Sequence, residues 1–199
     1  MTADDVIRAW DQADPTAIHP LRNVSEDAYW ESGKAQAAML ASVIHDGAKV
    51  LDFGCGDGRV AIPMAAHGFE VTAVDASQNM LDRLADRDPD VTTVQADADG
   101  IAAHLGRRRM DAVYSLAVLI HHSYQDCLHI ISKLRAAAKL GGILVLDWPV
   151  GAQPSEADLW IGVTTWSPQQ QAEACAVIGL EPVDSDLPWG VYRAVKAGS

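Results

Sequence analysis

The feature that most constrains the fold is a regular alternation of short apolar runs and helical segments between residues 49 and 147. Apolar runs of about five residues suit strands that are buried on both faces, and the segments between them repeat apolar residues at helical spacing. This alternation predicts a parallel sheet with helices on both faces. We expect strands at 49–53, 70–74, 91–95, 111–115 and 143–147, and helices at 59–67, 77–86, 99–105 and 124–139, the last closed by Gly141-Gly142.

The segment before this alternation predicts a helical cap. Ser25 is a good N-cap residue, and apolar residues recur at helical spacing after it, so we expect a long helix at about 25–45. Pro15 and Pro20 interrupt the chain before that helix. We therefore expect residues 1–46 to form a helical N-terminal cap.

The last third of the chain predicts a helix followed by a hairpin. Ser167-Pro168 combines an N-cap with proline at the first helical position. The runs 181–186 and 190–196 are joined too closely for a crossover helix, so they should pair antiparallel. The expected fold class is α/β: a doubly wound, mostly parallel seven-stranded sheet with an antiparallel terminal hairpin, formed by residues 47–199 as one domain.

Composition narrows the class of protein. The 199 residues include 15 Lys and Arg against 27 Asp and Glu, a formal net charge of −12, so nucleic acid is an unfavourable partner. The basic run at 107–109 is interpreted as a solvated loop. Three dispersed cysteines lack metal-ligand spacing, which indicates reduced thiols, no metal site and a cytoplasmic location. No apolar stretch approaches the roughly 20 residues of a membrane span, and we expect a monomer or a homodimer.

A glycine-rich turn follows the first expected strand. Gly54, Gly56 and Gly58 lie between that strand and the next helix, in a Gly-x-Gly-x-Gly pattern. Such a turn brings backbone close to a ligand at the carboxyl end of the strand, where a Cβ atom would interfere. The spacing differs from the Gly-x-Gly-x-x-Gly of dinucleotide sites.

An acidic residue ends the second expected strand. Asp75 follows Val71-Thr72-Ala73-Val74, at the place where a ribose diol lies in sites of this topology. A carboxylate can accept hydrogen bonds from both ribose hydroxyls. Together with the glycine turn, Asp75 predicts a nucleoside-containing ligand.

At this point the sequence resembles the class I S-adenosylmethionine-dependent methyltransferases. The resemblance rests on Leu-Asp-Phe-Gly-Cys-Gly-Asp-Gly-Arg, Val-Thr-Ala-Val-Asp-Ala-Ser-x-x-Met-Leu and Gln-Ala-Asp-Ala, in this order, and covers residues 29–147. It implies S-adenosylmethionine as cofactor, with the glycine turn at the methionyl part, Asp75 at the ribose and Asp97 at the adenine. The implied cofactor contacts are Asp52, Gly54, Cys55, Gly56, Gly58, Asp75, Ala76, Met80, Asp97, Ala98, Ser115 and Leu116.

The segment Tyr29-Trp30-Glu31-Ser32-Gly33-Lys34 resembles a second family feature. In several relatives an aromatic residue followed by Gly-Arg reaches the cofactor carboxylate. The resemblance implies cofactor contacts from Tyr29, Gly33 and Lys34, although lysine offers a point charge where arginine offers a fork. An amphipathic helix with a solvated lysine explains the same residues equally well.

His121 and His122 follow the fourth expected strand. S-adenosylmethionine brings an activated methyl group, so the protein mainly orients and desolvates the acceptor. A general base is needed only where the acceptor must lose a proton, and histidine suits that role near neutral pH. His121 is the stronger candidate for a base and His122 for a packing residue, and the pair resembles the small-molecule branch of the family.

The predicted function is methyl transfer to a small-molecule acceptor at an oxygen, nitrogen or carbon atom. Trp148, Trp160 and Trp166 are candidates for an aromatic pocket wall or, equally, for core residues. The strand-four turn lacks the Asn/Asp-Pro-Pro-aromatic sequence of nucleic-acid amino methyltransferases. Three alternatives remain: methylation of protein or RNA, binding of S-adenosylmethionine for other chemistry, and a nicotinamide dehydrogenase.

Overall fold

The computed structural model describes residues 3–19, 22–151, 153 and 163–197. By the density of contacts along the chain, it divides into two compact units, Met1–Asp97 and Ala98–Ser199. Each unit has its own buried strands and its own helices.

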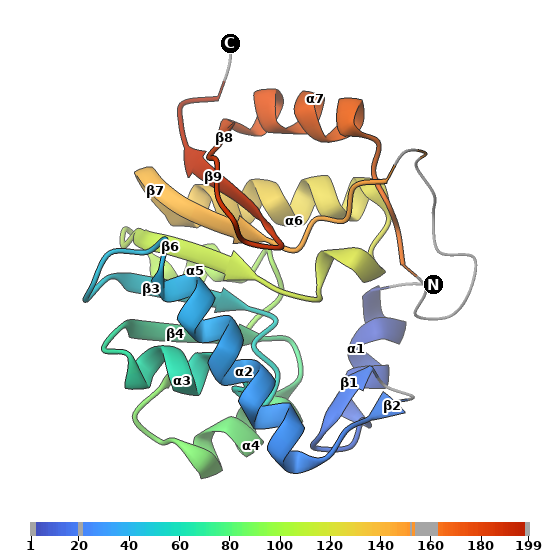
Figure 1. Cartoon of the computed structure of the whole chain (residues 1–199), viewed down its shortest axis with the longest axis vertical. Coiled ribbons are helices and arrows are strands. Elements are labelled where there is room, and N and C mark those ends of the chain that lie inside the picture. The colour runs from blue at the N-terminus through green and yellow to red at the C-terminus, as the bar shows by residue number, and fades with distance from the viewer. Residues whose placement is uncertain (1–2, 20–21, 152, 154–162, 198–199) are drawn as a thin grey trace. The chain divides into compact units, whose positions relative to one another are not determined.

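The first unit begins with four elements that precede its sheet (Figure 1). Ser25 caps the long helix as expected, because its side chain accepts a hydrogen bond from the amide of Ala28 at 3.3 Å. The short antiparallel pair before this helix was not predicted. The four elements are α1 (Ala3–Asp11), β1 (Ala17–His19), β2 (Arg22–Asn23) and α2 (Glu26–Ala41).

Three parallel strands in the order β5-β4-β3 form the sheet of the first unit. Val50, Leu51, Ala73 and Val74 are almost completely buried in it, as expected for central parallel strands. Two helices connect the strands, and α2 packs beside the first of them. The elements are β3 (Lys49–Phe53), α3 (Ala61–Ala66), β4 (Glu70–Asp75), α4 (Gln78–Arg87) and β5 (Thr92–Gln95).

Four strands in the order β6-β7-β9-β8 belong to the second unit. The pair β6–β7 is parallel, whereas β9 pairs antiparallel with both β7 and β8. The elements are α5 (Ile101–Leu105), β6 (Met110–Ser115), the 3₁₀ turn η1 (Leu119–His121), α6 (Tyr124–Ala137), β7 (Ala138–Leu146), α7 (Pro168–Ile178), β8 (Leu180–Pro182) and β9 (Gly190–Ala194).

These strands confirm the expected fold class, a mostly parallel seven-stranded α/β sheet with an antiparallel terminal hairpin. The expected closure of α6 by Gly141-Gly142 is wrong. The helix ends at Ala137, and both glycines lie within β7. Pairing of β7 already begins at Ala138 opposite Met110, and an irregularity before Ala112 takes up the extra residues.

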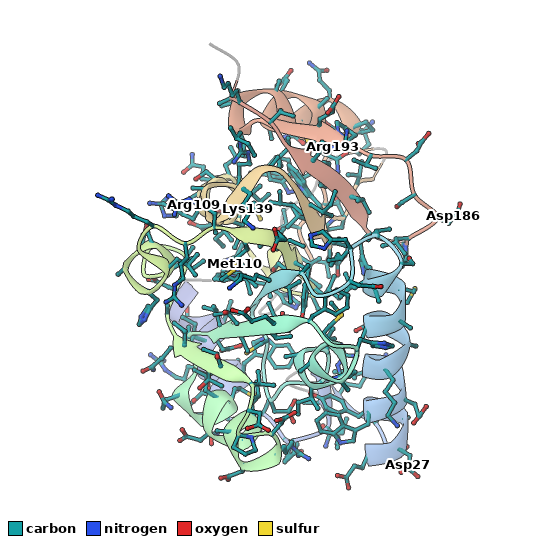
Figure 2. The ribbon with its side chains drawn as sticks, turned by 90° about the vertical axis from the view of Figure 1, so that its left-hand side faces the viewer. Asp27, Arg109, Met110, Lys139, Asp186 and Arg193 are labelled. Atoms are coloured by element: carbon teal, nitrogen blue, oxygen red, sulfur yellow. The ribbon has the colours of Figure 1, made fainter. Side chains whose placement is uncertain are left out.

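The basic run at 107–109 lies in the loop before β6, and all three arginines are exposed, as expected. Figure 2 shows Arg109, Met110 and Lys139 at this amino-terminal end of β6 and β7. Lys139 pairs there with Asp111 at 2.5 Å rather than joining a basic surface. Among the described residues, no helix is both long and apolar enough to cross a membrane.

Candidate functional site

The glycine turn joins the end of β3 to α3 and adopts a backbone that ordinary side chains disfavour. Gly54, Gly56 and Gly58 have φ angles of 76°, 55° and 89°. A Cβ atom on Gly58 would lie 2.7 Å from Cγ of Leu84, whereas one on Gly56 would meet nothing within 4 Å. The turn is therefore packed against α4 at its far end and open at Gly56.

Asp75 ties the glycine turn to the end of β4. One carboxylate oxygen accepts from the amide of Gly56 at 2.9 Å, and the other accepts from the amide of Ser77 at 2.9 Å. Burial raises the pKa of Asp75, and the amides of Ser77 and Gly56 oppose that shift. This carboxylate is therefore fixed from both sides, beside the open position at Gly56.

The N-terminal segment packs on the start of α4 through Asp11. The carboxylate of Asp11 accepts from the hydroxyl of Ser77 at 2.6 Å, and its carbonyl accepts from the side chain of Asn79 at 2.7 Å. Met80 is buried in the same place, in a cluster with Ala13 and Ala17. Nothing in the sequence marked Asp11 for this contact, because it joins residues more than sixty positions apart.

A buried pair links α2 to the glycine turn. The hydroxyl of Tyr29 donates to Asp57 at 2.6 Å, and Asp57 is 1% exposed. Burial raises the pKa of Asp57, and the Tyr29 hydrogen bond is the largest of the effects that lower it. Arg87 lies 3.8 Å from the other carboxylate oxygen, and the guanidinium of Arg59 lies over the Tyr29 ring. Sequence reasoning missed Asp57, although it stands within the glycine motif.

The remaining predicted residues of α2 occupy different environments. Gly33 is buried, and a Cβ atom there would lie 2.0 Å from the carbonyl oxygen of Arg59. Lys34 is exposed and pairs with Glu31 at 2.7 Å. Trp30 lies beneath the guanidinium of Arg87 at 4.7 Å. The place of Lys34 is thus that of a solvated helix lysine, and its contact with a cofactor stays a prediction.

The first unit contains most of the predicted cofactor residues. Asp52 and Cys55 are buried, and burial together with the carboxylates of Asp52 and Asp75 raises the pKa of the Cys55 thiol well above its ordinary value. That thiol is therefore neutral near pH 7. Asp97 is exposed at the end of the first unit, and Ala98 is buried at the start of the second. The predicted cofactor residues of the first unit are Tyr29, Gly33, Lys34, Asp52, Gly54, Cys55, Gly56, Gly58, Asp75, Ala76, Met80 and Asp97.

In the second unit, Ser115 ends β6, and Leu116 follows it into a strained turn. Ala117 has a φ of 59°, and its amide donates to Asp147 at 3.2 Å. His121 is buried in the 3₁₀ turn that follows. Burial lowers the pKa of His122, so this imidazole is neutral near pH 7.

Two tryptophans after β7 and a tyrosine of α6 pack on one another. Trp148 and Trp166 meet edge to face at 5.0 Å, and Tyr124 meets Trp166 in the same way at 5.0 Å. Both tryptophans are buried, so the structure places them in the core. Trp160, the third candidate for a pocket wall, lies outside the described residues.

In the described part of the chain, no group of three or more His, Cys, Asp or Glu side chains could hold a metal ion. The three cysteines are free and buried. The groups that stand out chemically are therefore the glycine turn with Asp75 in the first unit, and Asp147 with the histidines in the second.

Comparison with known proteins agrees with this geometry. Residues 50–142 match the family model described as a methyltransferase domain. The ubiquinone biosynthesis O-methyltransferase of Caulobacter sp. (strain K31) is 29% identical over 170 residues, which cover 73% of this chain and 63% of that protein. The CcbJ methyltransferase of Streptomyces caelestis has a TM-score of 0.69 at 20% identity, with 96% of both chains covered. The 1,6-didemethyltoxoflavin-N1-methyltransferase of Burkholderia thailandensis has a TM-score of 0.66 at 21% identity, covering 86% of this chain and 80% of that one.

The strand order, the glycine turn and these likenesses define a Rossmann-like fold of the class I type. Residues 50–142 carry a methyltransferase domain, and the chain is similar to methyltransferases over that range and beyond it. The chain spans less than two thirds of the length of the curated relatives it matches.

Proposed function

We propose that this protein transfers a methyl group from S-adenosylmethionine to a small-molecule acceptor in the cytoplasm. The observation that carries the proposal is the position of Asp75. Its carboxylate is held by the amides of Gly56 and Ser77, beside a turn that is open at Gly56. The three buried, free cysteines support a reducing location.

The glycine turn and Asp75 fit the cofactor chemically. The amides of Gly56 and Ser77 each hold one Asp75 oxygen, and the amide of Ala76 also acts on the carboxylate, which leaves it acceptor capacity for a ribose hydroxyl. The open side of Gly56 gives the backbone room to approach a ligand. We assign cofactor contacts, with Asp75 first, to Tyr29, Gly33, Lys34, Asp52, Gly54, Cys55, Gly56, Gly58, Asp75, Ala76, Met80, Asp97, Ala98, Ser115 and Leu116.

When bound, S-adenosylmethionine supplies an activated methyl group and its own leaving group. The protein's residues then have two tasks, which are to align the acceptor and to exclude water. For an acceptor that must lose a proton, we assign His121 as the general base, because it is buried directly after the β6 turn. We assign His122, whose pKa is lowered by burial, a packing role.

Three observations support a small acceptor. One curated relative is named a ubiquinone biosynthesis O-methyltransferase, and one structural neighbour is named a 1,6-didemethyltoxoflavin-N1-methyltransferase. A net charge of −12 disfavours RNA. A protein acceptor, an RNA acceptor and use of the sulfonium for other chemistry are the alternatives that an experiment must separate.

The test is to incubate the protein with S-adenosylmethionine and panels of phenols, amines, short peptides and RNA, and to measure S-adenosylhomocysteine. We expect its formation to depend on a phenol or an amine, with a product heavier by one methyl group in place of a hydrogen. Formation that depends only on peptide or RNA would overturn the small-molecule assignment. Consumption of the cofactor without a methylated product would overturn methyl transfer.

A further inference from the structure

The turn after β6 holds a strained residue. Among the described residues, Ala117 alone combines a side chain with a positive φ, at 59°. An alanine in the left-handed region costs on the order of 1–2 kcal/mol, so neighbouring contacts must hold it there. Such strain at the carboxyl end of a sheet strand marks a place whose geometry matters.

Asp147, the first residue after β7, supplies those contacts. Its carboxylate accepts from the amide of Ala117 at 3.2 Å, and its own amide donates to the carbonyl of Ser115 at 3.0 Å. Asp147 therefore forms hydrogen bonds with the turn at both Ser115 and Ala117. No sequence pattern indicates this role, because a lone Asp before Trp148 matches none of the motifs that carry the family resemblance.

The same turn leads directly to His121. The 3₁₀ turn η1 places His121 in a buried position, and the carbonyl of Ile120 accepts from the amide of Thr164 at 2.7 Å. The backbone between Ser115 and His121 is thus held at both ends.

Asp147 and His121 also interact through their charges. Burial raises the pKa of Asp147, whereas the Ala117 amide and the charge of His121 lower it. Burial is the largest effect that lowers the pKa of His122; the charge of Asp126 in the first turn of α6 opposes it, and the charge of His121 adds to it.

We propose that Asp147 is a positioning residue for His121. Its carboxylate holds the strained turn and stabilises the imidazolium that forms when His121 takes a proton from the O–H or N–H of the acceptor. Asp147 takes no proton itself, and the proton leaves His121 for solvent after the reaction. The catalytic part rests on the proposed function, whereas the hold of Asp147 on the turn and the effect of its charge on His121 do not.

The pairing is tested by following the imidazole titrations by NMR in the full chain, with His121→Gln to assign the signal. Asp147→Asn keeps an oxygen for the Ala117 amide but removes the charge. We expect the His121 midpoint to fall by about 0.5–1 pH unit, because a nearby carboxylate favours the imidazolium. Asp147→Glu, which keeps the charge, should hold the midpoint near its wild-type value.

Asp99→Asn is the matched control. Asp99 is a carboxylate on the exposed surface of the same unit, where it pairs with His129 at 3.0 Å, so this variant should leave the His121 midpoint unchanged. An unchanged His121 midpoint in Asp147→Asn would overturn the pairing, whatever the activity. If Asp147→Asn does not fold, Asp147→Glu provides the test. This variant keeps the negative charge, so a His121 midpoint well below the wild-type value would contradict the proposal that the charge at position 147 stabilises the imidazolium.

Kinetics test the catalytic part. Asp147→Asn should lower kcat about 10- to 100-fold, with little change in the KM for S-adenosylmethionine. In the pH profile, the acidic limb of kcat/KM should shift to lower pH, because His121 must be neutral to act as a base and Asp147→Asn lowers the pH at which it becomes neutral.

The double variant tests whether the two residues act together. Adding Asp147→Asn to His121→Gln should lower kcat no further, because the base is already absent. A further fall in kcat as large as that in the single Asp147→Asn variant would overturn the coupling. A wild-type protein without any turnover would count against the proposed function, while the NMR result would still stand.

Discussion

Asp57 is a nearly fully buried carboxylate in a turn that is otherwise rich in glycine. Its hydrogen bond comes from Tyr29 on α2, and Arg87 adds a more distant charge at 3.8 Å. A buried carboxylate without a donor would be costly, so the hydroxyl of Tyr29 couples the helix to the turn.

Tyr29→Phe tests this coupling. Loss of the hydroxyl should lower the free energy of unfolding by about 1–3 kcal/mol at neutral pH, because Asp57 remains buried and charged. The hydrogen bond lowers the pKa of Asp57, so its loss raises that pKa further. The loss in free energy of unfolding caused by Tyr29→Phe is therefore largest above the pKa of Asp57. It becomes smaller as the pH falls through that pKa, because Asp57 is then neutral in both proteins.

Urea unfolding at two pH values, one near neutral and one low enough to protonate Asp57 in both proteins, measures this difference. Tyr124→Phe is the control, since its hydroxyl donates to the uncharged carbonyl of Thr165 at 2.6 Å. Its deficit should not depend on pH. A Tyr29→Phe deficit of equal size at both pH values would contradict the role assigned to Asp57.

At the scale of elements, α2 approaches α3 closely because of one residue. Gly33 is buried on the face of α2 that meets the carbonyl of Arg59, just ahead of α3. Glycine is unfavourable inside a helix by roughly 1 kcal/mol relative to alanine, so its presence here reflects the packing.

Gly33→Ala should therefore destabilise the protein despite the better helix propensity of alanine. The added Cβ atom would lie 2.0 Å from a carbonyl oxygen, which forces the helix to move and costs about 1–3 kcal/mol by overpacking. Ala38→Ser, on an exposed position of the same helix, should change stability by less than about 0.5 kcal/mol. An increase in thermal stability of Gly33→Ala would show that the contact is not limiting.

Helix starts were predictable from local chemistry. Ser25, Ser77 and Ser167 each accept from a backbone amide three residues on, as their sequence context indicates. The early start of β7 was not predictable, because it depends on pairing with Met110 of β6, which is distant in sequence. Strands β1 and β2 have only three and two residues, too few to show an alternating pattern. Distance in sequence also explains why the contacts Asp57–Tyr29 and Asp147–Ala117 were missed, since their partners lie 28 and 30 positions apart.

At the scale of the whole molecule, the strand order expected from the sequence already places the glycine turn and Asp75 together. Carboxyl ends of parallel strands share one edge of a sheet, and both features follow such ends. The place of Lys34 was less predictable, since surface pairing with Glu31 competes with any role in binding. Net charge and family likeness further favour a small acceptor, but they carry no information on its identity.

The central claim is that Asp75 and the glycine turn hold the methyl donor, and calorimetric titration with S-adenosylhomocysteine tests it most directly. Wild-type protein should bind at one site, and Asp75→Ala should bind more weakly by about 1.5–3 kcal/mol, roughly 10- to 150-fold. Asp86→Asn, on an exposed position of α4, should bind like wild type. Absence of binding by the wild-type protein, or unchanged affinity in Asp75→Ala, would contradict the account.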